Sequence, residues 1–229
     1  MRLPHGFRGV PRALAGAAVV LLAAGGPAAV AATGPPPAPA AAPAAEGLSA
    51  RVPSDRTDPR TATAELTIPS IGVTDLHVVP YEGTTDDGPG TRIQNRGVAA
   101  SPYGEKGGVG PGETGNYLVT AHRLSAGGPL RDLPSLEKGD SVLVTEGGTV
   151  YEYRITETRQ TSFRSERSLA EQRAEVPGEP GEKPTRAMIT LSTCATPEDD
   201  AAGNFWRDAY DNPEHRIDRI GVLVASRPA

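Results

Sequence analysis

The residue with the clearest chemical potential is Cys194, the only cysteine among 229 residues. A single cysteine cannot form an internal disulfide. Residues 188–191 before it are apolar and β-prone, which predicts a strand, and residues 195–200 after it break the pattern. A thiol at the end of a strand, beside a loop, is a good position for a nucleophile. The alternative is a buried free cysteine that serves as a small hydrophobe.

A thiol needs a proton acceptor or a positive neighbour to become a useful thiolate. Among four histidines, His122 ends a predicted strand (116–121) and enters a Gly-rich segment, the same local setting as Cys194. It is therefore the candidate acid/base, and His215, at the start of the last predicted strand, is the alternative. His77 lies inside a predicted strand, where a structural role is expected, and His5 lies in the N-terminal segment.

Acyl transfer also requires a donor for the negative charge of a tetrahedral intermediate, and a guanidinium can supply it. Arg216 and Arg219 both lie on the last predicted strand, residues 216–225. Their odd separation places their side chains on opposite faces of a strand. Only one of them can therefore face the thiol.

No other chemistry is clearly encoded. The sequence has no Gly-rich phosphate-binding loop ending in Lys-Ser/Thr and no Cys/His metal spacing, so no cofactor is expected. The pairs Asp86–Asp87 and Asp199–Asp200 could bind calcium, although such pairs are more often solvated turns. A formal net charge of −5 gives no electrostatic case for nucleic acid as a partner.

The N-terminal region predicts export. Residues 1–32 combine three arginines, an apolar run at 13–24 and a small-residue stretch, which fits a cleaved signal peptide or an uncleaved membrane anchor. Residues 33–62 are rich in Pro and Ala and predict an extended linker. The folded domain is expected over residues 63–229, long enough for one sizeable core.

Within that domain, short β-prone runs separated by turn residues predict at least six strands. These runs are residues 64–68, 76–79, 116–121, 140–145, 149–155, 188–191 and 216–225. Gly147–Gly148 predicts a hairpin between two of them. Residues 83–115 read as a long loop region with one short helix, and residues 165–173 as another short helix. The class is mainly β, as a single barrel.

Several of these segments resemble the sortase family of cysteine transpeptidases. Residues 190–194 (TLSTC) fit the family's Thr-Leu-x-Thr-Cys pattern, and residues 120–123 (TAHR) resemble its His motif, with Ala121 where Gly is more usual. Residues 115–117 and 128–133 are similar to class E sortases of high-GC actinobacteria. The resemblance covers about residues 66–225.

The resemblance implies a closed eight-stranded sortase-type barrel carrying Cys194 as nucleophile, His122 as acid/base and an arginine as oxyanion stabiliser. It favours Arg216 over Arg219, and suggests that Thr193 helps to frame the substrate. The implied reaction cleaves a C-terminal Leu-x-x-Thr-Gly-like sorting signal between Thr and Gly, through a thioester.

The implied partners are secreted proteins that carry a sorting signal and an amine of a peptidoglycan precursor or pilin. The implied location is the extracytoplasmic face of the membrane or the cell wall. Two alternatives remain: an exported Cys-His peptidase or amidase, and a non-enzymatic surface β-domain.

Overall fold

The computed structural model describes residues 58–229. The predicted export segment, residues 1–32, and most of the predicted linker, residues 33–62, lie outside the described residues. The first strand begins at Ala64. Within the described part of the chain, no helix is both long enough and apolar enough to span a membrane.

Eight strands form a closed barrel, confirming the mainly β, eight-stranded barrel expected above. They are β1 (Ala64–Ile68), β2 (Val73–Glu82), β3 (Ala99–Tyr103), β4 (Gly115–Thr120), β5 (Ser141–Glu146), β6 (Thr149–Ser162), β7 (Ala187–Cys194) and β8 (His215–Pro228). Around the barrel their order is β1-β2-β3-β4-β7-β8-β6-β5. The α-helices are α1 (Gly88–Gln94), α2 (Glu166–Arg173) and α3 (Thr196–Ala201), with 3-10 turns η1 (Pro69–Ile71) and η2 (Leu133–Ser135).

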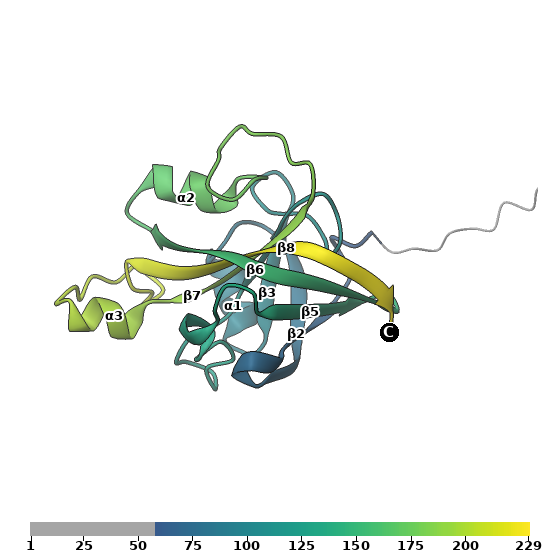
Figure 1. Cartoon of the computed structure of the whole chain (residues 1–229). Helices are drawn as coiled ribbons and strands as arrows, with labels where there is room; N and C mark the ends of the chain where they lie inside the picture. Colours follow the sequence, from purple (N-terminus) through teal and green to yellow (C-terminus); the bar gives the residue numbers. More distant parts are fainter. Residues whose placement is uncertain (1–57) are drawn as a thin grey trace, which may run out of the picture. The chain divides into compact units, whose positions relative to one another are not determined.

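The barrel places distant parts of the sequence side by side. β4 and β7 pair in parallel, and β7 pairs with β8 in antiparallel fashion, so that β7 lies between the strand that precedes His122 and the strand that carries Arg216. In Figure 1, β7 leads directly into α3 at one end of the barrel, and α2 lies beside β6.

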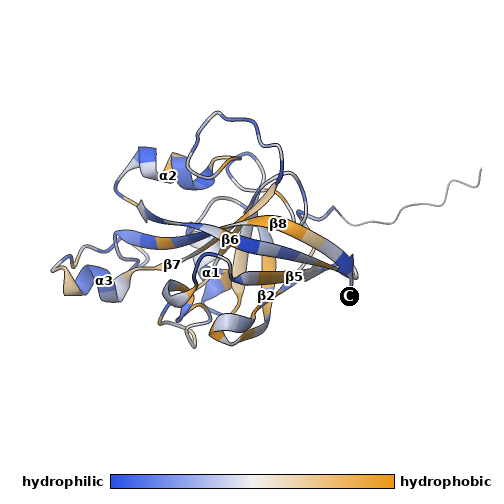
Figure 2. Cartoon of the chain, viewed as in Figure 1, coloured by the Kyte–Doolittle hydropathy of each residue, from blue (hydrophilic) through white to orange (hydrophobic). Residues whose placement is uncertain are grey.

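Alternating side chains fill the barrel with an apolar core, as the period of two along a strand requires. Buried members include Leu66, Ile68, Val119, Val144, Tyr153, Ile189 and Leu191. Strands β4 and β7 are buried on their outer face as well. The β6–β7 connection covers that face, since Asn116 Nδ2 donates to the backbone oxygens of Gln172 and Ala174. The short helices α2 and α3 are mostly hydrophilic (Figure 2).

Three local expectations were wrong. The strand predicted over residues 76–79, which Pro80 was expected to end, continues to Glu82, because β1 pairs with β2 only up to Val78 and β3 pairs from Val78 onward. Pro80 therefore has a strand on one side only, where its missing N–H is tolerated. The region expected as a loop around α1 contains β3. The loop expected after Cys194 begins with α3.

Candidate active site

The side chains of Cys194 and Arg216 project to the same, outer face of the barrel wall. Leu191 points into the core, so by alternation Cys194 projects to the opposite, outer side of β7. Cys194 and Arg216 are Cα partners in the β7–β8 ladder. Directly opposed residues in an antiparallel pair project to one face with Cβ atoms about 4.5–5.5 Å apart. The register thus assembles the two groups.

His122 reaches the same place from β4. Thr120 is the partner of Ser192 in the parallel β4–β7 ladder, and the amide of Ala121 donates to Ser192 O at 3.2 Å. His122, one residue further, lines a cleft of about 340 Å³ together with Cys194. The imidazole Nε2 lies 2.7 Å from Asn95 Oδ1. An amide oxygen can only accept, so this contact holds a proton on Nε2. Nδ1 is then the nitrogen that binds or releases the second proton of the imidazolium.

Arg216 is almost completely buried, at 1% exposure. Its Nε donates to Asp86 Oδ2 at 3.0 Å, and its Nη1 donates to the carbonyls of Pro213 and His215 at 3.1 and 3.3 Å. The guanidinium carbon lies 4.1 Å from the centre of the Phe163 ring, a cation–π contact. Its Nη2 has no hydrogen-bond acceptor among residues 58–229.

The protonation of the site follows from burial. Burial raises the pKa of the Cys194 thiol, and the positive charge of Arg216 partly offsets this. Burial also lowers the pKa of His122, with Asp86 opposing and Arg216 reinforcing the shift. At neutral pH the neutral thiol and neutral imidazole are therefore the main forms, and the thiolate–imidazolium pair is a minority species.

The two alternatives to His122 and Arg216 lie elsewhere. Arg219 is the ladder partner of Leu191, on the opposite face of β8 from Arg216. Its guanidinium donates to the carbonyls of Leu133 and Pro134 at η2. His215 Nδ1 lies 2.6 Å from Asp199 Oδ1, within an ion-paired cluster at α3. The structure thus groups Arg216 and His122 with the thiol, and neither Arg219 nor His215.

Thr193 lies on the core side of β7, opposite to Cys194. It is buried, and its hydroxyl donates to Ala121 O at 2.8 Å. This bond joins the end of the strand that carries the thiol to the residue preceding His122. Its position is that of a group which holds the two strand ends in register, rather than one that faces the cleft.

Sequence reasoning missed several neighbours. Asn95, which binds the imidazole, follows α1, whose bounds the sequence did not define, and Phe163 follows the last residue of β6. Asp86 was interpreted as a turn residue, yet it is buried against Arg216. Arg123 joins the two strand ends, since its Nη1 contacts Cys194 O at 3.4 Å and Glu198 at 3.2 Å. No pattern of neighbouring residues in the sequence predicts these contacts.

The acidic pairs considered for calcium contact protein donors. Asp86 binds Arg216, and Asp87 caps α1 by accepting from the amide of Gly90 at 2.8 Å. Asp199 binds His215, and Asp200 lies 2.6 Å from Arg207. Over residues 58–229, no group of three or more His, Cys, Asp or Glu side chains is arranged to hold a metal ion.

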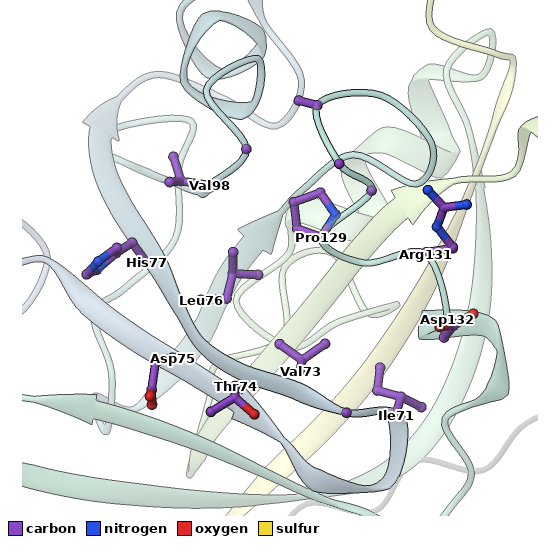
Figure 3. A pocket seen from close by; sticks show the side chains of 15 residues that line it. Ile71, Val73, Thr74, Asp75, Leu76, His77, Val98, Pro129, Arg131 and Asp132 are labelled. Carbon is purple, nitrogen blue, oxygen red and sulfur yellow. The ribbon is translucent and has the colours of Figure 1, made fainter.

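A second hollow lies away from the thiol. It encloses about 510 Å³ between the start of β2 and the segment 126–132. Figure 3 shows Val73, Leu76, His77 and Pro129 around it. Although this hollow is larger than the cleft at Cys194, it contains neither the thiol, His122 nor Arg216. We therefore assign no function to this hollow.

A closed eight-stranded barrel with a thiol, an imidazole and a buried guanidinium gathered at one end defines the class of cysteine acyl-transfer enzymes. The sortase domain family model matches residues 66–207, which is more than half of the chain and includes His122 and Cys194. The chain therefore belongs to the sortase family of cysteine transpeptidases. Sortases are typically enzymes of the cell surface.

Solved structures agree on the fold. A sortase E from Streptomyces avermitilis is 27% identical, with a TM-score of 0.53 over 76% of this chain and 93% of that chain. A sortase E1 from Streptomyces coelicolor with a tripeptide in its active site is 23% identical, with a TM-score of 0.54 over 76% and 94%. A sortase from Actinomyces oris is 21% identical, with a TM-score of 0.55 over 73% and 82%. Comparison with curated proteins gave no match.

Proposed function

We propose that this chain is a class E-type sortase that cleaves a Leu-x-x-Thr-Gly-like C-terminal sorting signal between Thr and Gly. The released acyl group passes to an amine of a peptidoglycan precursor or a pilin. The observation that carries the proposal is the pairing of Cys194 with Arg216 on the outer face of the barrel, beside the cleft that His122 lines. The 27% identity with a sortase E supports the subgroup.

In this reaction the Cys194 thiolate attacks the carbonyl carbon of the signal's Thr. The carbonyl oxygen becomes an oxyanion, and the unpaired Nη2 of Arg216 is the available donor for it. The C–N bond then breaks, and the His122 imidazolium gives its proton to the leaving Gly amine. Cys194 is left as a thioester and His122 as a neutral base.

Resolution of the thioester reverses the roles. The incoming amine attacks the thioester carbonyl, neutral His122 accepts the amine proton, and the Cys194 thiolate leaves. The contact of Asn95 with Nε2 leaves Nδ1 as the atom that gives and takes this proton. Thr193 acts as a positioning residue, because its bond to Ala121 O holds the two strand ends together.

The proposal also covers location and partners. An export segment at residues 1–32 and a Pro/Ala-rich linker at 33–62 would place the barrel at the extracytoplasmic face of the membrane. Secreted proteins that end in the sorting signal would be the substrates.

The test is incubation of the barrel, residues 58–229, with a Leu-Pro-x-Thr-Gly peptide series and glycine or diaminopimelate as the amine. We expect a product joining the peptide's Thr to the amine, and none from Cys194→Ala. A peptide cleaved at Thr-Gly with water as the only acceptor would instead identify a Cys-His peptidase. No cleavage of any peptide, with a thiol that stays inert in the folded protein, would favour a non-enzymatic surface domain.

A further inference from the structure

Asp86 is a buried carboxylate that the reaction described above does not use. It lies in the loop between β2 and α1, with a positive φ of 56° and 8% exposure. Its Oδ2 accepts from Arg216 Nε at 3.0 Å, and its Oδ1 accepts from Gln94 Nε2 at 2.9 Å. A non-glycine residue in this left-handed conformation is uncommon, and it persists only where its surroundings hold it.

The two residues that flank Asp86 in the sequence are themselves fixed by hydrogen bonds. Thr85 Oγ1 donates to Gln172 Oε1 at 2.9 Å and accepts from Arg173 Nε at 2.9 Å. Asp87 accepts from the amides of Thr84 and Gly90 at 3.1 and 2.8 Å. The carboxylate of Asp86 is thus fixed in place before it meets Arg216.

The guanidinium of Arg216 is also held in place, through contacts with Nε, with Nη1 and with one face of the group. Asp86 takes Nε, two backbone carbonyls take Nη1, and the ring of Phe163 covers a face. Of the three nitrogens of this guanidinium, only Nη2 lacks an acceptor among residues 58–229, although it is buried. A buried donor without a partner is costly, and natural structures retain few of them. Such a donor points to a ligand atom that is still to arrive.

Helix α1 connects this arrangement to the imidazole. Its last residue, Gln94, holds Asp86, and the residue that caps it, Asn95, holds His122. Two consecutive residues at the C-terminal end of one short helix therefore orient Arg216 and His122, the first through a carboxylate and the second directly.

We propose that Asp86 is a positioning residue for catalysis: it fixes the guanidinium of Arg216 so that Nη2 stays available for the oxyanion. This inference rests on the proposed function and deepens it. Asp86 itself contacts no reacting atom. Its negative charge also balances that of Arg216, which allows a guanidinium to be buried beside the thiol.

The test compares Asp86→Asn with Asp75→Asn, because Asp75 is also an aspartate with a positive φ, of 49°, but is exposed on β2. We expect Asp86→Asn to lower kcat about 100-fold, on the scale of losing one oxyanion donor, with KM within about threefold of the parent. Asp75→Asn should leave both unchanged. Equal kcat for the two variants would overturn the proposal.

Coupling to Arg216 separates positioning from general destabilisation. In an Arg216→Lys background, Asp86→Asn should lower kcat by less than about threefold, because residues that act as a unit are non-additive. A full 100-fold loss in that background would overturn the proposal.

If Asp86→Asn does not fold, Gln94→Leu, which keeps the ion pair but frees the carboxylate, should show the same non-additivity with about a tenfold loss in kcat. An additive loss, or none, would overturn the proposal.

The pH profile gives a second readout. The charged groups that bear on His122 are Asp86, which raises its pKa, and Arg216, which lowers it. Asp86→Asn should therefore move the acid limb of the kcat/KM profile to lower pH, whereas an unmoved limb would count against the proposal. If Arg216→Lys lowers kcat about 100-fold or more and Asp86→Asn keeps the parental kcat, this inference alone fails. If Arg216→Lys has no effect either, the proposed function fails with it.

Discussion

Two neighbouring rungs of the β7–β8 ladder lie on the same outer face and differ sharply in their hydrogen bonding. In the reactive rung, Cys194–Arg216, Cys194 lines the cleft, and the buried Arg216 keeps one unpaired guanidinium donor. The buried rung, Ser192–Asp218, is sealed: Gln172 Nε2 donates to Ser192 Oγ at 3.2 Å and to Asp218 Oδ1 at 3.0 Å. Thr161 Oγ1 donates to Asp218 Oδ2.

The two rungs differ in whether their polar atoms all have partners within the protein. In the buried rung the polar atoms satisfy one another, and burial raises the pKa of Asp218 while three side-chain donors oppose that shift. Such a network stabilises and specifies the fold. In the reactive rung one donor of Arg216 has no partner, and under the proposed function this donor binds the carbonyl oxygen of the substrate. Changes to the first rung should cost activity, and changes to the second should cost stability.

The largest expected effect comes from the two arginines of β8. Arg216→Lys removes the free Nη2 and should lower kcat about 100- to 1,000-fold. Arg219→Lys is the matched control, since Arg219 lies on the opposite face and binds η2 carbonyls. It should change kcat by less than about tenfold. Steady-state cleavage of the sorting peptide measures both, and similar losses for the two variants would contradict the assignment of Arg216.

A smaller loss of activity is expected at the imidazole. Asn95→Ala removes the contact with Nε2 and frees the ring to rotate, which should lower kcat about tenfold. Arg96→Ala changes the next, exposed residue and should leave kcat unchanged. If both variants keep parental kcat, the tautomer and orientation of His122 do not depend on Asn95.

The smallest effect on activity, with a clear effect on stability, is expected in the buried rung. Gln172→Leu removes three buried hydrogen bonds, those of the Gln172 side chain with Thr85 Oγ1, Ser192 Oγ and Asp218 Oδ1. The free energy of unfolding should fall by roughly 2–4 kcal/mol, while kcat of the folded fraction changes only a few-fold. Gln160→Leu, at an exposed glutamine on β6, is the control for urea unfolding. A large loss in kcat with unchanged stability would reverse the roles given to the two rungs.

Much of this barrel was predictable because its strands carry local signals. The alternating or apolar runs, the Gly147–Gly148 turn and the strand ahead of Cys194 all depend on neighbouring residues, and the structure places strands there. The residue types of the thiol, the imidazole and the arginine were also visible. β3 was missed because residues 99–103 contain Ser101 and Pro102 and no sustained alternation.

What the sequence could not supply is register and long-range partnership. That Arg216 rather than Arg219 opposes Cys194 depends on the β7–β8 register, since a shift of one residue would reverse every side chain. The pairing of Asp86 with Arg216 joins residues 130 positions apart. No local pattern distinguishes a carboxylate of that kind from one in a solvated turn.

The most direct test of the central claim is the rate of alkylation of Cys194 in the folded protein as a function of pH. We expect labelling without denaturation, with a rate that rises through a pKa above the usual value for cysteine of about 8.5, because burial disfavours the thiolate. The kcat/KM profile should be flat between the lowered pKa of His122 and this raised pKa. A thiol that reacts only after unfolding would show that Cys194 is not the nucleophile of the folded protein.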